Sequence, residues 1–155
     1  MSIEIIKDAS VRIDPTVKIF GTGKIILGPK VQIRAYAVIE IDGTLEIGDQ
    51  SVIGYHDFIQ CSGDMKIGKG TLVGPNTVML ASSHRITNVP LVNEKMRRSF
   101  LTIGDNVWVG ANCTINHGIV IGNNAIIGAN SFVNKSVSAD SIVGGVPAKL
   151  LRTRN

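Results

Sequence analysis

Aliphatic residues recur every six positions in the second half of the chain. Residues 103–138 divide without remainder into the hexads IGDNVW, VGANCT, INHGIV, IGNNAI, IGANSF and VNKSVS. Each hexad opens with Ile or Val, Gly is frequent at the second position, and the fifth residue is mostly small. An α-helix would place residues six apart on different faces. The pattern instead predicts a parallel β-helix, in which three hexads form a coil of about 18 residues and coils stack about 4.8 Å apart.

The first half follows the same rule with a spacing of twenty residues. The segments IFGTGKIILG (19–28), IEIDGTLEIG (39–48) and IQCSGDMKIG (59–68) align, and every third hexad carries two extra residues. These extra residues predict a wider corner, and Gly beside a hexad leader is expected to relieve the backbone at the bend. The hexad leaders are all aliphatic: Ile13, Ile19, Leu27, Ile33, Ile39, Ile47, Ile53, Ile59, Ile67, Val73, Met79, Ile103, Val109, Ile115, Ile121, Ile127 and Val133. We therefore expect one all-β domain over residues 1–155, shaped as a triangular prism.

The regular pattern breaks after Met79. The hexad MLASSH begins a fourth wide corner, in which Ser83 takes the place of Gly63 and His84 the place of Asp64. The next leader is Ile103, so residues 85–102 are expected to project as a loop, and long loops in compact repeats are usually functional or disordered. His84 would then face outward at the root of this loop. It is either a general base, as imidazole often is near neutral pH, or a plain polar corner residue.

Composition and charge narrow the class of protein. Hydrophobic residues make up 44% of the chain but aromatic residues only 5%, and 17 Gly are present, as expected for β-structure with tight turns. No apolar run approaches about 18 residues and the N-terminus lacks the pattern of a signal peptide, so we expect no membrane span and a cytoplasmic location. Two Cys are too few for a disulfide framework. The net charge of +4 suits an anionic small ligand better than nucleic acid.

Three sequence features together resemble a known family. The hexads around TIGDNVWVGA, the SSH before the loop and the ending IVGGVPAKLLR are similar to the hexapeptide-repeat acyltransferases over about residues 47–152. The nearest subgroup comprises galactoside, maltose and serine acetyltransferases and polysaccharide O-acetyltransferases. This resemblance implies a left-handed β-helix, a homotrimer with active sites between subunits, acetyl-CoA as co-substrate and no metal. It also implies direct transfer of the acetyl group to an acceptor hydroxyl or amine, with His84 as the general base.

The resemblance also assigns residues to acetyl-CoA. Trp108 matches a tryptophan near the active cleft, although packing between subunits would explain it equally well. Ala111 stands where galactoside enzymes have a serine, and Ala129 matches a backbone contact to pantetheine. The remaining matches are Asn134, Lys135, Lys149 and Arg152. From Asn106 onward Asp140 is the single acid, so the tail over about residues 139–155 is basic and could meet phosphates or simply be solvated.

The acceptor half of the site departs from the galactoside pattern. Gly54 and Ser62 stand where those enzymes bind sugar, so Tyr55, His56 and Asp57 are the acceptor candidates, with a carbohydrate of a surface polysaccharide as the expected acceptor. His117 replaces a common proline. Two other functions stay open: a scaffold without catalysis, and a zinc enzyme using the three histidines of the chain.

Overall fold

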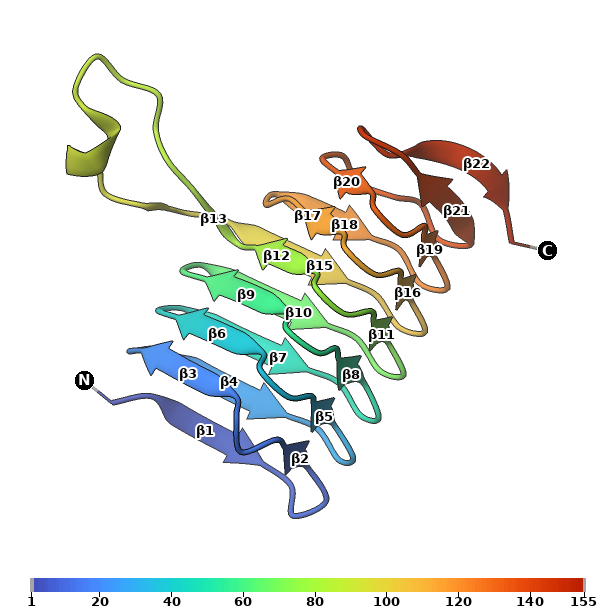
Figure 1. The fold of residues 1–155 in the computed structure, drawn as a ribbon, viewed down its shortest axis with the longest axis horizontal. Coiled ribbons are helices and arrows are strands. Elements are labelled where there is room, and N and C mark those ends of the chain that lie inside the picture. The colour runs from blue at the N-terminus through green and yellow to red at the C-terminus, as the bar shows by residue number, and fades with distance from the viewer. Residues whose placement is uncertain (1, 155) are drawn as a thin grey trace.

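The chain winds into a triangular prism of three parallel sheets, seen in a computed structural model that describes residues 2–154 (Figure 1). Sheet A contains β1 (Glu4–Lys7), β4 (Lys24–Leu27), β7 (Thr44–Ile47), β10 (Asp64–Ile67), β15 (Phe100–Ile103) and β18 (Ile119–Ile121). Sheet B contains β2 (Arg12–Ile13), β5 (Gln32–Ile33), β8 (Val52–Ile53), β11 (Leu72–Val73), β16 (Trp108–Val109), β19 (Ile126–Ile127), β21 (Ser141–Gly144) and β22 (Lys149–Thr153). Sheet C contains β3 (Lys18–Gly21), β6 (Val38–Ile41), β9 (Phe58–Cys61), β12 (Val78–Leu80), β17 (Thr114–Ile115) and β20 (Phe132–Val133). The predicted all-β, left-handed parallel β-helix is confirmed.

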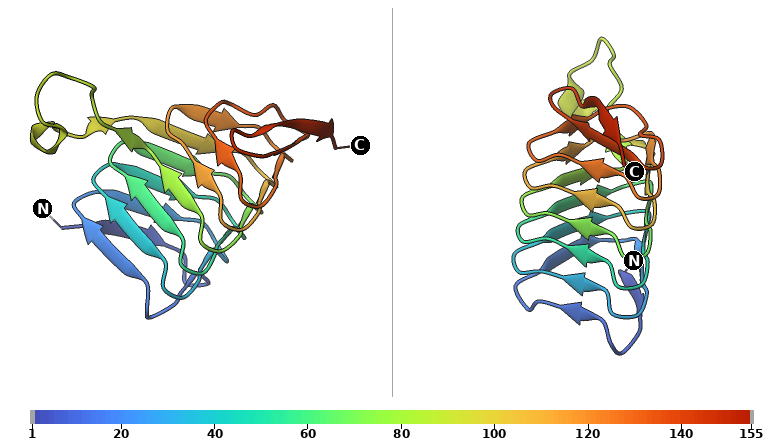
Figure 2. Two further views of the ribbon diagram at one scale, coloured as in Figure 1. Left: turned by 45° about the horizontal axis from the view of Figure 1, so that its top comes forward. Right: turned by 90° about the vertical axis from the view of Figure 1, so that its right-hand side faces the viewer.

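The strand register reproduces the repeat lengths read from the sequence. Within sheet A, Glu4 pairs with Lys24, Lys24 with Thr44, and Thr44 with Asp64, in steps of twenty residues. Leu101 pairs with Ile119, a step of eighteen residues. Each interior coil therefore hydrogen-bonds to the coils before and after it, and Figure 2 shows the resulting stack from two further sides.

The hexad leaders form the column of the core. All seventeen are buried except Ile13 and Ile19, which are partly buried because they lie in the first coil and have a neighbouring coil on one side only. The fifth residues of the C-terminal hexads also point inward and are buried: Val107, Cys113, Ile119, Ala125, Ser131 and Val137. Alternation of these two positions around the prism makes one continuous apolar interior.

The glycines at the second hexad position serve a different purpose from the one predicted. Their φ angles are ordinary, but a Cβ at Gly48 would lie 2.7 Å from the backbone of Gly68 in the next coil. They are needed because coils approach closely at the corners. The left-handed backbone lies instead at the fourth position, which is Asn at residues 76, 106, 112, 124 and 130. Asn tolerates this conformation better than most residues.

The projecting segment is a β-hairpin whose boundaries differ from the predicted 85–102. β13 (Ser82–Ser83) pairs antiparallel with β14 (Arg97–Arg98), and a short 3₁₀ turn, η1 (Leu91–Asn93), lies beyond them. Asp64 pairs with Phe100, so Phe100 rather than His84 occupies the corner position that follows Lys24, Thr44 and Asp64. The chain returns to the prism at Ser99, because Leu101 fills the inward site of the preceding coils and is fully buried.

The C-terminal tail closes sheet B. β21 continues the parallel ladder beside β19, the chain turns back through a cis peptide at Val146–Pro147, and β22 pairs antiparallel with β21. Figure 2 shows this antiparallel pair at the end of the stack, far from the N-terminal coil. Among residues 2–154, no helix has the length and apolar character needed to cross a membrane.

Candidate active site

A groove of about 610 Å³ runs along the outer face of sheet B and its corner with sheet C. We call it the sheet B groove. Its floor is a row of apolar side chains from neighbouring strands, of which Trp108 is 52% exposed and Leu72 46%. The other lining residues are Arg34, Val52, Gly54, Tyr55, Val73, Gly74, Pro75, Gly110, Ala111, Ile126, Ile127, Gly128 and Ala129. An exposed apolar row of this kind is typical of a surface that binds a ligand or another chain.

Unpaired backbone donors line one edge of this groove. Within residues 2–154, the N–H groups of Ala111 and Ala129 have no hydrogen-bond partner. A Cβ at Gly74 would lie 2.8 Å from the nitrogen of Ala111, and one at Gly110 would lie 2.6 Å from the nitrogen of Ala129. The glycines therefore leave these two N–H groups uncovered. Such donors can bind the carbonyl groups of a ligand or stabilise an oxyanion.

An aromatic cluster lies at the N-terminal end of the groove, where two successive coils turn from sheet B to sheet C. The rings of Tyr36 and His56 are stacked with centroids 5.0 Å apart, and the Arg34 guanidinium lies 5.9 Å from the centre of the Tyr55 ring. Tyr36 and His56 occupy the fourth hexad position with φ of 63° and 58°. For a tyrosine this left-handed conformation costs roughly 1–2 kcal/mol.

Asp57 lies beneath this corner and does not face the groove. Its side chain is fully buried and accepts hydrogen bonds from the N–H of Gly54 at 2.6 Å and of Thr77 at 2.8 Å. Burial raises the pKa of Asp57 to about 7, and the two N–H donors oppose part of that rise. Asp57 therefore holds the turn that carries Tyr55 and His56, rather than offering a carboxylate to an acceptor.

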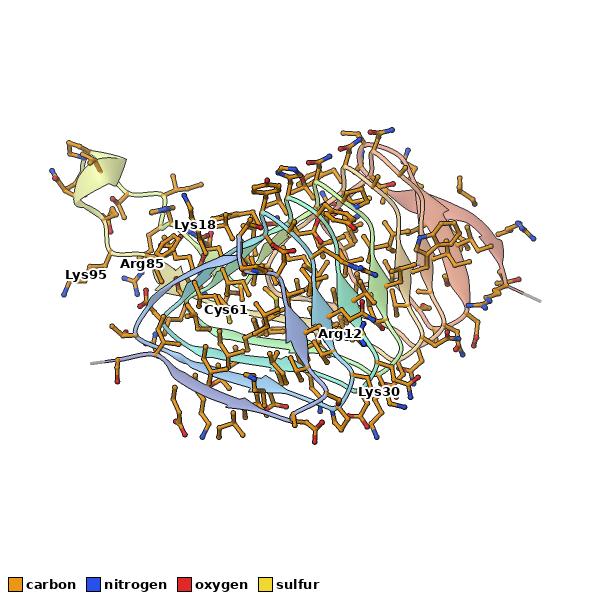
Figure 3. All side chains as sticks on the ribbon, turned by 60° about the horizontal axis from the view of Figure 1, so that its bottom comes forward. Arg12, Lys18, Lys30, Cys61, Arg85 and Lys95 are labelled. Atoms are coloured by element: carbon orange, nitrogen blue, oxygen red, sulfur yellow. The ribbon has the colours of Figure 1, made fainter. Side chains whose placement is uncertain are left out.

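His84 is exposed directly after β13, at the base of the projecting hairpin. The hairpin base is fixed to the prism by side-chain hydrogen bonds. Ser82 Oγ donates to Gln60 Oε1 at 2.6 Å, and Arg98 Nη2 donates to the Asp42 carbonyl at 3.1 Å. Ser99 Oγ also lies 3.2 Å from His117 Nδ1. The arms of the hairpin thus leave from defined positions, and Figure 3 shows Arg85 and Lys95 on it, away from the prism.

The structure brings together some of the predicted site residues within one chain. Trp108, Ala111, Ala129 and Tyr55 share the sheet B groove. His84 lies at the opposite corner, between sheets C and A, and is not part of the groove. The other predicted residues are exposed outside the groove: Asn134 and Lys135 after β20, Lys149 and Arg152 on β22, and His56 at the aromatic corner. β22 extends the same sheet that forms the groove.

The histidines and cysteines of the chain are separated. His56 stacks on Tyr36 and His117 contacts Ser99, while His84 lies on the hairpin. Among the described residues, no three side chains of metal-binding type come together. Cys61 and Cys113 are free and buried, and burial raises the pKa of the Cys61 thiol to about 12. A buried thiol of this kind is a poor nucleophile.

Several residues of this surface were missed at the level of sequence. Tyr36, Arg34 and the two free N–H groups were not predicted. A signal for the first was present, because Tyr36 and His56 stand in two successive coils at the fourth hexad position, where the later coils have Asn.

The chain is similar to known acyl-transferring enzymes in sequence and in fold. Residues 101–135 match the family model for the bacterial transferase hexapeptide (six repeats). Galactoside O-acetyltransferase of Escherichia coli is 36% identical over 89 residues, which cover 57% of this chain and 44% of that protein. The chain thus spans less than half the length of this relative.

Solved structures extend the likeness to most of the chain. A hexapeptide-repeat acetyltransferase from Vibrio cholerae is 32% identical with a TM-score of 0.78, covering 83% of this chain and 73% of that one. The same enzyme in complex with acetyl coenzyme A has a TM-score of 0.69 at 25% identity, covering 97% and 71% of the two chains. AntD, an N-acyltransferase from Bacillus cereus, has a TM-score of 0.83 at 20% identity, covering 97% and 84%, which is a likeness of fold.

Proposed function

Because the chain belongs to the hexapeptide-repeat acyltransferase family, we propose that it transfers an acetyl group from acetyl-CoA to a hydroxyl or amine of a small acceptor, a carbohydrate in the first instance. The observation that carries this proposal is the sheet B groove, in which the uncovered N–H groups of Ala111 and Ala129 border an apolar floor. The Vibrio cholerae relative, solved with acetyl coenzyme A, supports the choice of donor.

The donor would lie along this groove. Trp108 and its apolar neighbours suit the pantetheine arm, and the two N–H groups suit its amide carbonyls or the thioester oxygen. Lys149 and Arg152, on the strand that extends sheet B, would meet the CoA phosphates, joined by Asn134 and Lys135 near the same end. Cationic side chains are effective phosphate ligands.

His84 would act as the general base. It takes the proton from the acceptor hydroxyl while the acceptor oxygen attacks the thioester carbonyl carbon. The resulting oxyanion accepts a hydrogen bond from a groove N–H. Collapse breaks the carbon–sulfur bond, and the imidazolium returns its proton to the CoA thiolate. The products are the acetylated acceptor and free CoA, without a covalent acyl-enzyme.

This reaction requires two subunits. His84 and the sheet B groove lie on different corners of one prism, so a groove is completed when the hairpin of a neighbouring subunit reaches it. A homotrimer with three equivalent sites meets this requirement, because each subunit offers one hairpin and one groove.

Replacement of His84 tests the chemistry. His84→Ala is expected to retain acetyl-CoA binding by calorimetry and to lose turnover by a factor on the order of 10² or more, because the proton acceptor is missing. Release of CoA thiol over a panel of sugar, amino-sugar and amino-acid acceptors is the readout. His117→Ala is the control and should keep turnover within a few-fold. A His84→Ala enzyme of near-normal activity would exclude the general base.

Mixed trimers test the shared site. Ala129→Trp is expected to block the groove and abolish turnover. Refolding His84→Ala together with Ala129→Trp gives mixed trimers. If His84 of one subunit serves the groove of the next, some of these trimers combine an intact His84 with an intact groove, so part of the activity returns. A site built within a single subunit would give no recovery, and a scaffold without catalysis would show no thiol release in any sample.

A further inference from the structure

The Tyr36–His56 corner places ring side chains at the left-handed fourth position in two adjacent coils. At the corner between sheets B and C, the later coils place Asn76, Asn112 and Asn130 in the left-handed fourth position. Tyr36 and His56 adopt the same backbone, for which His is a common residue and Tyr an uncommon one. The same backbone occurs at Lys30 and Gln50, so the exposed rings and not the conformation distinguish this corner.

The exposed rings of this corner form a flat surface. Tyr36 is 57% exposed although its ring stacks on His56 with an interplanar angle of 15°. Tyr55, 50% exposed, stands beside them against Arg34. Aromatic faces next to an arginine are the usual platform for a planar nucleobase, with stacking largely independent of base identity.

The charges around the platform favour an anion. Arg34 is exposed and also lines the sheet B groove, and Lys18 begins the strand that leaves the preceding corner. Asp57 offers no exposed carboxylate to the platform, because it is buried beneath the turn with its two N–H partners. A guanidinium at this position can bind the oxygens of a phosphate.

The surface is longer than a single sugar ring. Three coil steps separate the Tyr36 corner from the Ala111 corner, roughly 14 Å at the usual strand spacing. A single sugar whose reacting hydroxyl lay beside Ala111 would not reach Tyr36.

We propose that Tyr36, His56, Tyr55 and Arg34 bind the nucleoside diphosphate part of a nucleotide-activated sugar, which is the acceptor of the proposed acetyl transfer. The base stacks on the Tyr36 ring and Arg34 binds the diphosphate. The sugar extends along the groove toward Ala111, where the acetyl group arrives. This inference rests on the proposed function for the chemistry but concerns a separate surface of the same groove.

Replacing each ring by Asn tests the proposal while keeping a residue that suits the left-handed backbone. Tyr36→Asn and His56→Asn install the side chain that the later coils carry at the equivalent position, so the variants should melt at the same temperature as the parent or higher. Binding of uridine diphosphate and thymidine diphosphate is measured by calorimetry. Each variant, and Arg34→Gln, is expected to weaken binding at least tenfold. The KM for a uridine-diphosphate sugar should rise by a similar factor, while the KM for acetyl-CoA stays unchanged.

Lys30→Asn is the matched control. Lys30 also has a left-handed backbone, at the corner between sheets A and B outside the groove. Its replacement should change neither the affinity for the nucleotides nor the KM for the uridine-diphosphate sugar. The proposal is overturned if the parent protein does not bind either nucleotide, or if Tyr36→Asn binds them normally. Tyr36-dependent use of an unactivated oligosaccharide, with no nucleotide binding, would equally overturn it. Nucleotide binding that depends on Tyr36 in a protein without acyl transfer would instead refute the proposed reaction and leave the subsite standing.

Discussion

At the scale of single residues, the buried side chain of Asp57 has a specific role at its corner. Asp57 stands in a column of inward fifth-position residues, between Ala37 in the coil before it and Thr77 in the coil after it. Its carboxyl group ties two coils together by accepting N–H groups from Gly54 and Thr77. Burial of a carboxyl group favours its neutral form, so this contact is sensitive to pH.

The stability of the protein should therefore fall between about pH 4 and pH 7. The folded-state pKa of Asp57 is raised from 3.8 to about 7, so over this range the unfolded chain loses a proton that the folded chain keeps. The free energy of unfolding then declines as pH rises, by up to about 4 kcal/mol, and levels off above pH 7.

Urea denaturation of Asp57→Asn from pH 4 to pH 8 measures this contribution. The variant should lack the decline that the parent shows, whereas Glu46→Gln, on the exposed face of sheet A, should keep it. Equal slopes in the parent and Asp57→Asn would show that Asp57 does not titrate in this range.

At the scale of elements, the projecting hairpin is an insertion into an otherwise unbroken ladder. Gly63 donates to the Ala81 carbonyl, and Asp64 donates to the Ser99 carbonyl, so coil stacking resumes across the insertion. β13 and β14 pair with each other and not with the three prism sheets. The hairpin can therefore be removed without removing a coil.

Deletion of residues 83–98 should separate folding from function. The sequence Ala81–Ser82–Ser99–Phe100 would then match Cys61–Ser62–Gly63–Asp64 of the coil before it, with the twenty-residue register restored. We expect the circular dichroism spectrum to be unchanged and the melting temperature to shift by only a few degrees. Turnover by thiol release should fall at least a hundredfold, because His84 is lost with the hairpin. A deletion variant that still turns over would place the chemistry elsewhere on the prism.

At the scale of the whole molecule, the faces of the prism differ in character. Sheet A carries charged residues on each strand from β1 to β10. Sheet B presents the apolar floor of the groove, and sheet C presents Phe58 between Val38 and Val78. Because the face of sheet B is the proposed ligand groove, the apolar row of sheet C is the face that favours self-association around a common axis.

We therefore expect a mass in solution of three times the 16.5 kDa chain, measured by light scattering. Phe58→Glu should shift the mass toward the monomer and abolish turnover, because no groove then receives a neighbour's hairpin. Glu46→Lys on sheet A is the control and should remain trimeric. Acetyl-CoA should raise the melting temperature of the parent but not of the monomeric variant, since ligand binds the assembled state. An active monomer would contradict the shared site.

The amino-acid sequence by itself determined the prism. The hexads, which make coils of twenty residues in the first half and eighteen in the second, specify the inward positions, the strand register and the place of the insertion. They do so because every coil must bury the same set of inward side chains against its neighbours. It also identified His84, Trp108, Ala111 and Ala129 as candidates, through their place in the repeat and through the family resemblance.

Only the tertiary structure decided which of these residues meet. Stacking of coils brings Arg34, Tyr55, Trp108 and Ala129, distant along the chain, onto one groove, and leaves His84 on another corner. It also showed that Asp57 points inward, that Phe100 takes the corner position predicted for His84, and that the N–H groups of Ala111 and Ala129 are uncovered. These facts depend on contacts between coils, and the order of residues along the chain does not give those contacts.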